Sequence, residues 1–215
     1  MIQENVAAVK AQISSLPALK KPVQIVAASK YLDAPAMAQL WEAGISLVGE
    51  NRVDALKAKQ ALLKHLPFEW HFIGTLQTRK VKSMINDIVC LHALDRLSLA
   101  AEIEKYRFGP LKCFVQVNIS REPAKHGVAV EGLMDFLKAL KDFSKIEVIG
   151  LMGMAEDTDD QQRIRECFSE LASLCEKSRD IIPTCVELSM GMSGDYLLAL
   201  EEGATFVRLG SVLFK

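Results

Sequence analysis

Eight short runs rich in apolar and β-branched residues alternate along this chain with segments of helical periodicity. A run that is apolar throughout is typical of a strand buried on both faces, and parallel strands need the long crossover connections that the helical segments supply. Eight such units predict an α/β fold, a closed (β/α)8 TIM barrel, with a doubly wound open sheet as the alternative. The expected strands are residues 23–29, 45–48, 69–74, 87–93, 112–119, 147–152, 184–188 and 205–209.

Helical segments separate these runs, and the clearest period lies in residues 161–177. The other expected helices are residues 2–13, 36–43, 52–64, 78–84, 97–106, 130–140 and 195–202. No linker or low-complexity tract divides the chain, so we expect one domain over residues 1–215. The sequence stops at Lys215, just after the last strand. We therefore expect the eighth helix to be missing or very short, with the N-terminal helix covering the gap.

Charge and cysteine content narrow the class of protein. A net charge of −1 argues against a nucleic-acid partner held by phosphate contacts, and no apolar stretch is long enough to span a bilayer. The five cysteines are an odd number without a CxxC pair, which favours reduced core residues of a cytoplasmic protein. The four histidines are scattered without ligand spacing, so no metal site is expected.

A lysine ends the first strand, at a place where a barrel carries its chemistry. The C-terminal ends of barrel strands form the active-site mouth. Lys30 would point there into a cavity, lose its proton and attack a carbonyl carbon, which predicts a Schiff base with an aldehyde. A lysine at a strand end that extends into solvent is the alternative. Polar and glycine-rich residues follow the other strands at Gly49–Asn51, His71, Gly74, Asn118, Ser120, Met152–Met154, Ser189–Ser193 and Arg208–Ser211.

The segments after strands seven and eight predict a phosphate site, because many barrels hold a phosphate there. Ser189–Ser193 opens a helix, and Gly210-Ser211 permits close backbone approach to an anion. A plain helix cap at Ser193 and a tight turn at Gly210 are the alternatives, and Asp195 would oppose an anion unless it points outward. A Schiff-base lysine facing a phosphate cradle describes pyridoxal 5′-phosphate. Arg208 could then meet its ring nitrogen, or instead pair with a barrel glutamate.

Seven stretches of the sequence closely resemble one family, the YggS/PROSC pyridoxal-phosphate homeostasis proteins. The stretches are Ala28–Lys30, Gly49–Asn51, His71–Gln77, Val117–Ser120, Gly150–Met152, Leu188–Ser193 and Val207–Ser211. The resemblance implies a barrel like the alanine racemase N-terminal domain, of fold type III, with the cofactor on Lys30. It implies phosphate contacts from Ser193, Gly210 and Ser211, with Arg208 at the ring nitrogen. Asn51, His71 and Met190 would line the pocket, and Lys125 matches a common family lysine that is either a transfer lysine or a solvated loop residue.

The resemblance also implies a role in vitamin B6 homeostasis, in which the protein holds the cofactor and delivers it to apo-enzymes. We expect no robust catalytic activity, because a racemase needs a base on each face of the substrate. Tyr31 and His71 are the only candidates for the second base. A weak racemase-like enzyme acting on amino acids and a cofactor-free Schiff-base aldolase are the alternatives. The absence of a second domain predicts a monomer.

Overall fold

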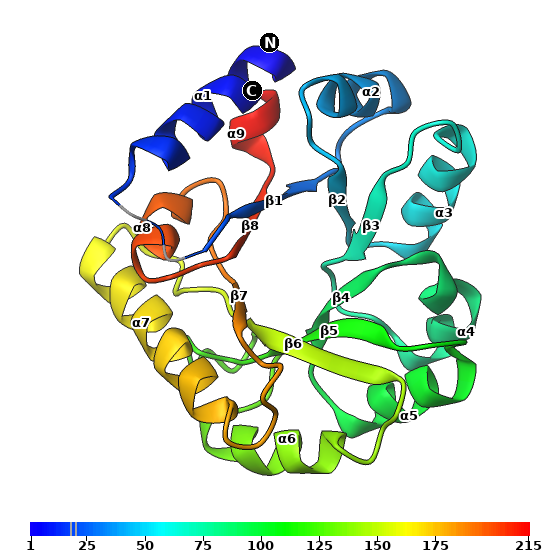
Figure 1. Cartoon of the computed structure of the whole chain (residues 1–215), viewed down its shortest axis with the longest axis vertical. Helices are drawn as coiled ribbons and strands as arrows, with labels where there is room; N and C mark the ends of the chain where they lie inside the picture. The colour runs from blue at the N-terminus through cyan, green and yellow to red at the C-terminus, as the bar shows by residue number, and fades with distance from the viewer. Residues whose placement is uncertain (18, 20) are drawn as a thin grey trace.

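Eight parallel strands close into a barrel in the order of the sequence, so the open-sheet alternative is wrong (Figure 1). The computed structural model describes residues 1–17, 19 and 21–215. The first and last strands pair through Ala27 and Leu209, which closes the barrel. The strands are β1 Gln24–Ala28, β2 Leu47–Glu50, β3 Glu69–Phe72, β4 Cys90–Leu94, β5 Leu111–Gln116, β6 Ile146–Met152, β7 Glu187–Ser189 and β8 Phe206–Leu209.

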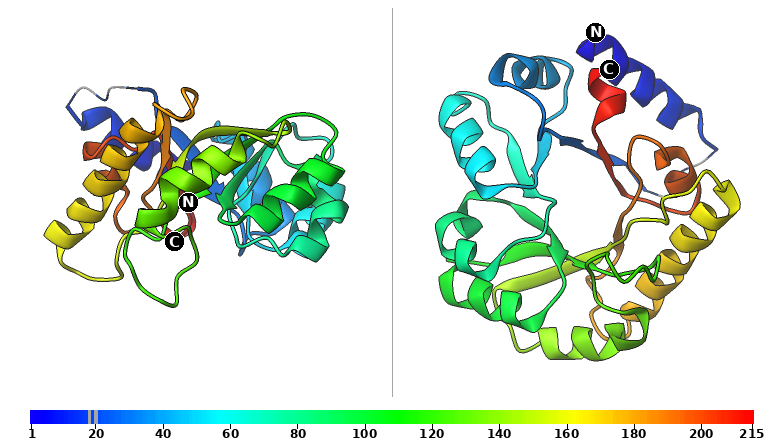
Figure 2. Two further views of the ribbon diagram at one scale, coloured as in Figure 1. Left: turned by 90° about the horizontal axis from the view of Figure 1, so that it is seen from below. Right: turned by 180° about the vertical axis from the view of Figure 1, so that it is seen from behind.

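Helices surround the barrel, as the right-hand view of Figure 2 shows. The α-helices are α1 Ile2–Ser15, α2 Ala34–Glu42, α3 Val53–Leu62, α4 Val81–Met84, α5 Leu97–Tyr106, α6 Leu133–Leu140, α7 Gln161–Ser178, α8 Tyr196–Glu201 and α9 Ser211–Phe214. Three 3-10 turns, η1 Thr78–Lys80, η2 Ile85–Asp87 and η3 Val130–Gly132, flank α4 and precede α6. Within the described residues, no helix has both the length and the hydropathy required to cross a bilayer.

Alternation along each strand sends side chains either outward to the helices or inward to the barrel. Trp70 on β3 faces outward and packs edge-to-face on Phe68, which in turn meets Trp41 of α2. The interior is filled from several strands at once: the ring centroids of Phe114 and Phe206 lie 5.2 Å apart. Strand and helix layers therefore share one apolar shell, while the barrel interior is a separate, smaller cluster.

The helix that follows the eighth strand, α9, is very short, as expected, and α1 lies beside it (Figure 1). The amide of Asn5 on α1 donates to the carbonyl oxygens of Leu213 at 3.3 Å and Lys215 at 3.1 Å. These bonds satisfy carbonyl groups at the end of α9 that lack helical partners. The N-terminal helix thus covers the side of the barrel that α9 leaves open.

Several element boundaries differ from those expected. The seventh strand begins at Glu187 rather than residue 184, because Cys185 closes a turn onto the carbonyl of Ile182. The third helix begins at Val53 rather than residue 52, and Arg52 holds the cap position without a side-chain bond. Four cysteines are buried, Cys167 is half-buried, and all five are free thiols, as expected.

Candidate functional site

Lys30 follows β1 at the C-terminal mouth of the barrel, beside the two elements that the sequence placed near it. The register pairs Ala28 with Gly49, so Lys30 and Asn51 each follow this pair by two residues at the same end of the barrel. On the other edge, a Cβ built on Gly210 would lie 3.7 Å from the Cβ of Ala28. The Lys30 side chain is exposed, with its ammonium 4.8 Å from the centroid of the Tyr31 ring. It lines neither of the two cavities described below, so the expectation that Lys30 points into a cavity stays a prediction.

A buried ion pair supports the backbone immediately before Lys30. Glu50 at the end of β2 is fully buried, and its Oε1 accepts from Ser29 Oγ at 2.8 Å and from Lys59 Nζ at 2.5 Å. The same ammonium donates to the carbonyl oxygen of Ser29 at 2.5 Å. Lys59 was not predicted from the sequence, where its only signal is its place on the inner face of α3. These three residues fix the direction in which the chain leaves β1.

Ser193 ties the loop after β7 to the loop after β8. Its hydroxyl oxygen accepts hydrogen bonds from the backbone N–H groups of Gly210 at 3.0 Å and Val212 at 3.3 Å. A cavity of about 490 Å³ opens beside this contact, lined by both loops and by α1. Gly191 has a φ of 90°, and a Cβ there would lie 2.7 Å from that of Ala199, so the loop takes this path only with glycine. The predicted phosphate segments therefore converge.

Asp195 turns back toward this loop instead of pointing outward. Its carboxylate accepts the N–H of Met192 at 2.6 Å. This N–H group, in the loop predicted to bind phosphate, is therefore not available to an anion. Burial raises the pKa of Asp195, against the opposing effects of that hydrogen bond and of Arg208. The carboxylate thus closes the loop and lies near the buried arginine.

Arg208 is buried and held by oxygens of neighbouring strands. Its Nη1 donates to the carbonyl oxygen and to the hydroxyl of Ser189, both at 2.7 Å, and Nη2 donates to the carbonyl of Gly153 at 3.1 Å. No described residue forms an ion pair with it, so the alternative of a glutamate partner is not observed. Burial lowers the pKa of Arg208 to about 10, and Asp195 acts in the opposite direction. The guanidinium remains charged at neutral pH and keeps two of its five N–H donors free of described partners.

His71 was expected at the mouth with Lys30, and that placement is wrong. It lies inside the barrel, paired in register with Gly49 and Cys90, because β3 continues past it to Phe72. Its Nδ1 lies 2.8 Å from Nε2 of His92, and Nδ1 of His92 lies 2.8 Å from the hydroxyl of Ser189. His92 was not predicted as a site residue, because it lies within an apolar strand and resembles a core residue.

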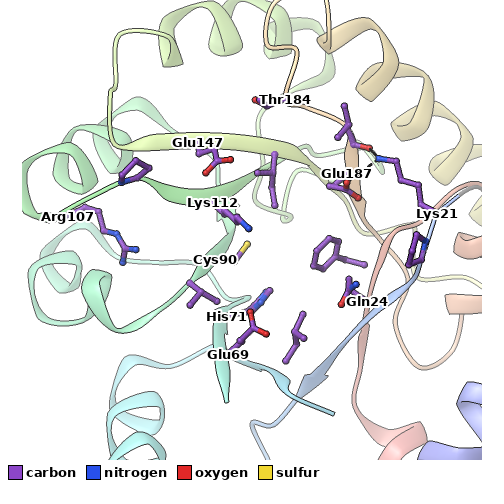
Figure 3. A pocket seen from close by; sticks show the side chains of 17 residues that line it. Lys21, Gln24, Glu69, His71, Cys90, Arg107, Lys112, Glu147, Thr184 and Glu187 are labelled. Atoms are coloured by element: carbon purple, nitrogen blue, oxygen red, sulfur yellow. Dashed lines mark hydrogen bonds and ion pairs between the residues drawn. The ribbon is translucent and has the colours of Figure 1, made fainter. Parts of the chain in front are cut away.

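A large cavity, drawn in Figure 3, lies at the strand starts, the end of the barrel opposite to the one at which Lys30 follows β1. It measures about 880 Å³ and is formed by the residues at the starts of the strands, including Gln24, Glu69 and Lys112. His71 and Cys90 reach it from the barrel interior. Cations and carboxylates share its wall, and Lys21 forms an ion pair with Glu187 at 3.1 Å. The volume of this cavity does not identify it as the predicted cofactor site, because the glycine- and serine-rich turns lie at the other mouth of the barrel.

The four histidines were expected to be scattered, but two of them lie together with a cysteine. His71, His92 and Cys90 are buried together, with one potential ligand atom from each within 4.8 Å of the others. A tetrahedral zinc ion would hold two imidazole nitrogens about 3.3 Å apart. The observed 2.8 Å is a hydrogen-bond distance instead. Burial raises the pKa of the Cys90 thiol, which favours its protonated form.

The remaining predicted residues take varied places. Asn51 is exposed at the mouth, where Gly74 packs on its backbone, whereas Met190 is fully buried in the outer core and lines neither cavity. Ser211 begins α9 and lines the smaller cavity. Lys125 is not a freely solvated lysine, since it pairs with Glu122 and donates to the carbonyl of Ala155 at 3.0 Å.

Comparison with known proteins agrees with this arrangement. Residues 2–215 match the family described as alanine racemase, N-terminal domain. A pyridoxal phosphate homeostasis protein of Aquifex aeolicus is 36% identical over 195 residues, covering 89% of this chain and 86% of the relative. One of Pseudomonas aeruginosa is 36% identical over 220 residues, covering 99% of this chain and 94% of the relative.

Solved structures extend the comparison. PipY of Synechococcus elongatus, determined with PLP bound, is 31% identical with a TM-score of 0.89, and 100% of each chain is covered. Alanine racemase of Corynebacterium glutamicum is 14% identical with a TM-score of 0.77, covering 99% of this chain and 60% of that one, so this likeness concerns the fold alone. The chain belongs to the YggS/PROSC family of pyridoxal phosphate homeostasis proteins, whose barrel is that of the alanine racemase N-terminal domain.

Proposed function

We propose that this protein binds pyridoxal 5′-phosphate in vitamin B6 homeostasis, holding its aldehyde on Lys30 as a Schiff base with loss of water. The observation that carries the proposal is the convergence of Lys30 with the Ser193–Gly210 contact at one mouth of the barrel. The PLP-bound structure of PipY, which this chain covers in full, supports the same ligand.

The residues around this mouth fit a phosphorylated aldehyde. The Ser193 hydroxyl oxygen accepts the N–H groups of Gly210 and Val212, so its own hydrogen can be donated to a phosphate beside the smaller cavity, and a phosphate accepts such a donor strongly. Ser211 stands in the same cavity wall. Arg208 brings a fixed positive charge with free N–H donors, which suits an unprotonated ring nitrogen. When bound, the cofactor supplies an electron sink, and a charged arginine partner keeps that sink weak.

The protein residues then have distinct tasks. Lys30 provides the amine, with its backbone held by the Glu50–Lys59 pair, and Asn51 stands next to it at the pocket rim. His71 and Met190 do not line this pocket but support it from the barrel interior and from the outer core. Lys125, tied to the loop after β6, stays a candidate for a lysine that assists transfer to apo-enzymes.

The main alternative is a weak racemase-like enzyme. It requires a second base opposite Lys30, and Tyr31 is the tyrosine beside that lysine, although 83% of Tyr31 is exposed. An exposed phenol lies in water, where it holds no defined position over a substrate. We therefore infer a carrier, monomeric and cytoplasmic, that hands its cofactor to apo-enzymes and lacks robust turnover.

Absorption spectroscopy with amino-acid turnover assays tests the proposal. The purified protein mixed with pyridoxal phosphate should show a visible band that borohydride or Lys30→Ala removes, and D- and L-amino acids should not be converted at enzymatic rates. The absence of a band at saturating cofactor would refute the binding role. Racemisation lost in Lys30→Ala would instead establish the alternative.

A further inference from the structure

A continuous line of buried polar contacts crosses the barrel interior from one end to the other. It runs from His71 through His92 and Ser189 to Arg208, and we call these four residues the barrel relay. Each member is at most 6% exposed. The relay begins at the large cavity formed by the strand starts and ends at the guanidinium below the Lys30 mouth. Buried polar groups are costly without partners, so the contacts that join each of these four residues to the next are informative.

Both histidines of the relay are neutral at physiological pH. Burial and the nearby Lys112 lower the pKa of His71 to about 4. Burial, His71 and Arg208 likewise lower the pKa of His92. A neutral imidazole donates through one nitrogen and accepts through the other. Each ring therefore has a defined tautomer, and the two tautomers must agree along the relay.

The charge of Arg208 selects the direction of the hydrogen bonds. A guanidinium only donates, so Ser189 Oγ accepts from it and its own hydrogen can go to Nδ1 of His92. Nε2 of His92 then donates to Nδ1 of His71, which leaves the Nε2–H of His71 facing the large cavity. In this direction every acceptor lone pair faces the buried cation and every proton points away from it. The reverse direction would turn the proton of His92 Nδ1 toward the cation.

We propose that His71, His92 and Ser189 are positioning residues that hold Arg208 in one orientation toward the cofactor's ring nitrogen. The inference rests on the proposed function for the role of Arg208, although the relay itself exists without cofactor. Serine hydroxyls and carbonyl oxygens are neutral partners, so they orient the guanidinium without pairing its charge. Two N–H donors of Arg208 have no partner among the described residues and are available to a ligand. The relay thus replaces the carboxylate that would otherwise fix a buried arginine.

Histidine NMR tests the relay without cofactor. In two-bond ¹H–¹⁵N spectra at neutral pH, His71 and His92 should both appear as neutral Nε2–H tautomers. Ser189→Ala should move Nδ1 of His92 toward the value of an unbonded ring nitrogen, and Ser189→Thr, which keeps the hydroxyl, should restore it. An imidazolium signal at neutral pH, or an unchanged His92 in Ser189→Ala, would overturn the relay.

Cofactor titration tests the positioning role. Ser189→Ala and His92→Phe should each raise the dissociation constant for pyridoxal phosphate about tenfold, the loss of one oriented hydrogen-bonding group. Both should change the pH dependence of the cofactor's absorption, because the partner of the ring nitrogen loses its fixed orientation. Cys90→Ala is the matched control, since Cys90 is buried beside both histidines but bonds to neither. Its pH profile should equal that of the wild type, and the circular dichroism of each variant should show that it folds.

The outcomes separate the inference from the function on which it rests. If the wild-type protein binds no cofactor, the proposed function fails while the NMR result still decides whether the relay exists. If the wild type binds cofactor and the relay variants match it in affinity and pH profile, the positioning role fails alone. Tight zinc binding that perturbs both histidines and disappears in Cys90→Ala would contradict the relay by making the cluster a metal site.

Discussion

The hydroxyl oxygen of Ser193 accepts the backbone N–H of Gly210 at 3.0 Å, which joins the loops after β7 and β8 into one surface. Neither loop forms this surface alone. The contact explains why two segments separated in sequence carry a single predicted function. It also allows the predicted phosphate site to be tested by experiment separately from Lys30, which lies at the same mouth.

Loss of the Ser193 hydroxyl should weaken phosphate binding selectively. Ser193→Ala removes a donor to phosphate, and a hydrogen bond to a charged group contributes about 1.5–3 kcal/mol, so cofactor affinity should fall at least about tenfold. Equilibrium titration with pyridoxal phosphate measures this. Unphosphorylated pyridoxal should bind the variant and the wild type equally, and Ser83→Ala, on the exposed face of α4, should change neither affinity. An equal loss for both ligands would contradict the assignment.

Removal of Lys59 should destabilise the fold as well as the Lys30 mouth. Lys59→Met leaves the carboxylate of Glu50 buried and unpaired, which costs about 3–5 kcal/mol of unfolding free energy. The double variant with Glu50→Gln should recover most of this loss, because no buried charge remains. Urea denaturation measures both values. Additive effects of the two substitutions would show that the pair is not coupled.

Acid should destabilise the protein through its buried histidines. The pKa of His71 is about 4 in the folded state, against an ordinary value of 6.5. Between these pH values the unfolded state binds the proton and the folded state does not. Stability is therefore complete above pH 6.5 and falls as the pH drops toward 4, by up to about 3 kcal/mol for this one residue.

Denaturant titrations across this pH range measure the slope. His71→Gln should flatten it, whereas His65→Gln, at an exposed histidine, should leave it unchanged. A wild-type protein equally stable at both ends of the range would contradict burial of His71 as a neutral ring.

Gly150 should tolerate no side chain. A Cβ at this position would lie 1.9 Å from the carbonyl oxygen of Glu187, where β6 and β7 pair. Gly150→Ala should lower the unfolding free energy by about 3 kcal/mol or more, because backbone on both strands must move. Gly132→Ala, with nothing within 4 Å of the new atom, should change it by less than about 1 kcal/mol. Thermal melts of the two variants compare them directly.

The barrel and its mouth were predictable because their signals are local. Apolar runs mark the eight strands, and a polar residue directly after a strand marks the C-terminal mouth, which placed Lys30 after β1 and Asn51 after β2. The depth of a residue within the barrel is not a local property. His71 stands one residue before the end of β3, and only the register with β2 and β4 shows that it lies inside.

Side-chain contacts between different strands inside the barrel could not be predicted from the sequence either. His92 and Ser189 are 97 positions apart and meet only because the barrel closes. Each looks like a core residue of its own strand. The support from Lys59 was missed for a related reason, since its partner atoms belong to the turn after β1 and to the end of β2.

Mass spectrometry after borohydride reduction tests the central claim most directly. The protein saturated with pyridoxal phosphate should gain one reduced cofactor, and peptide mapping should place it on Lys30; Lys125→Ala should keep the label and Lys30→Ala should lose it. An unlabelled protein, or a label on Lys125 with Lys30 unmodified, would contradict the account.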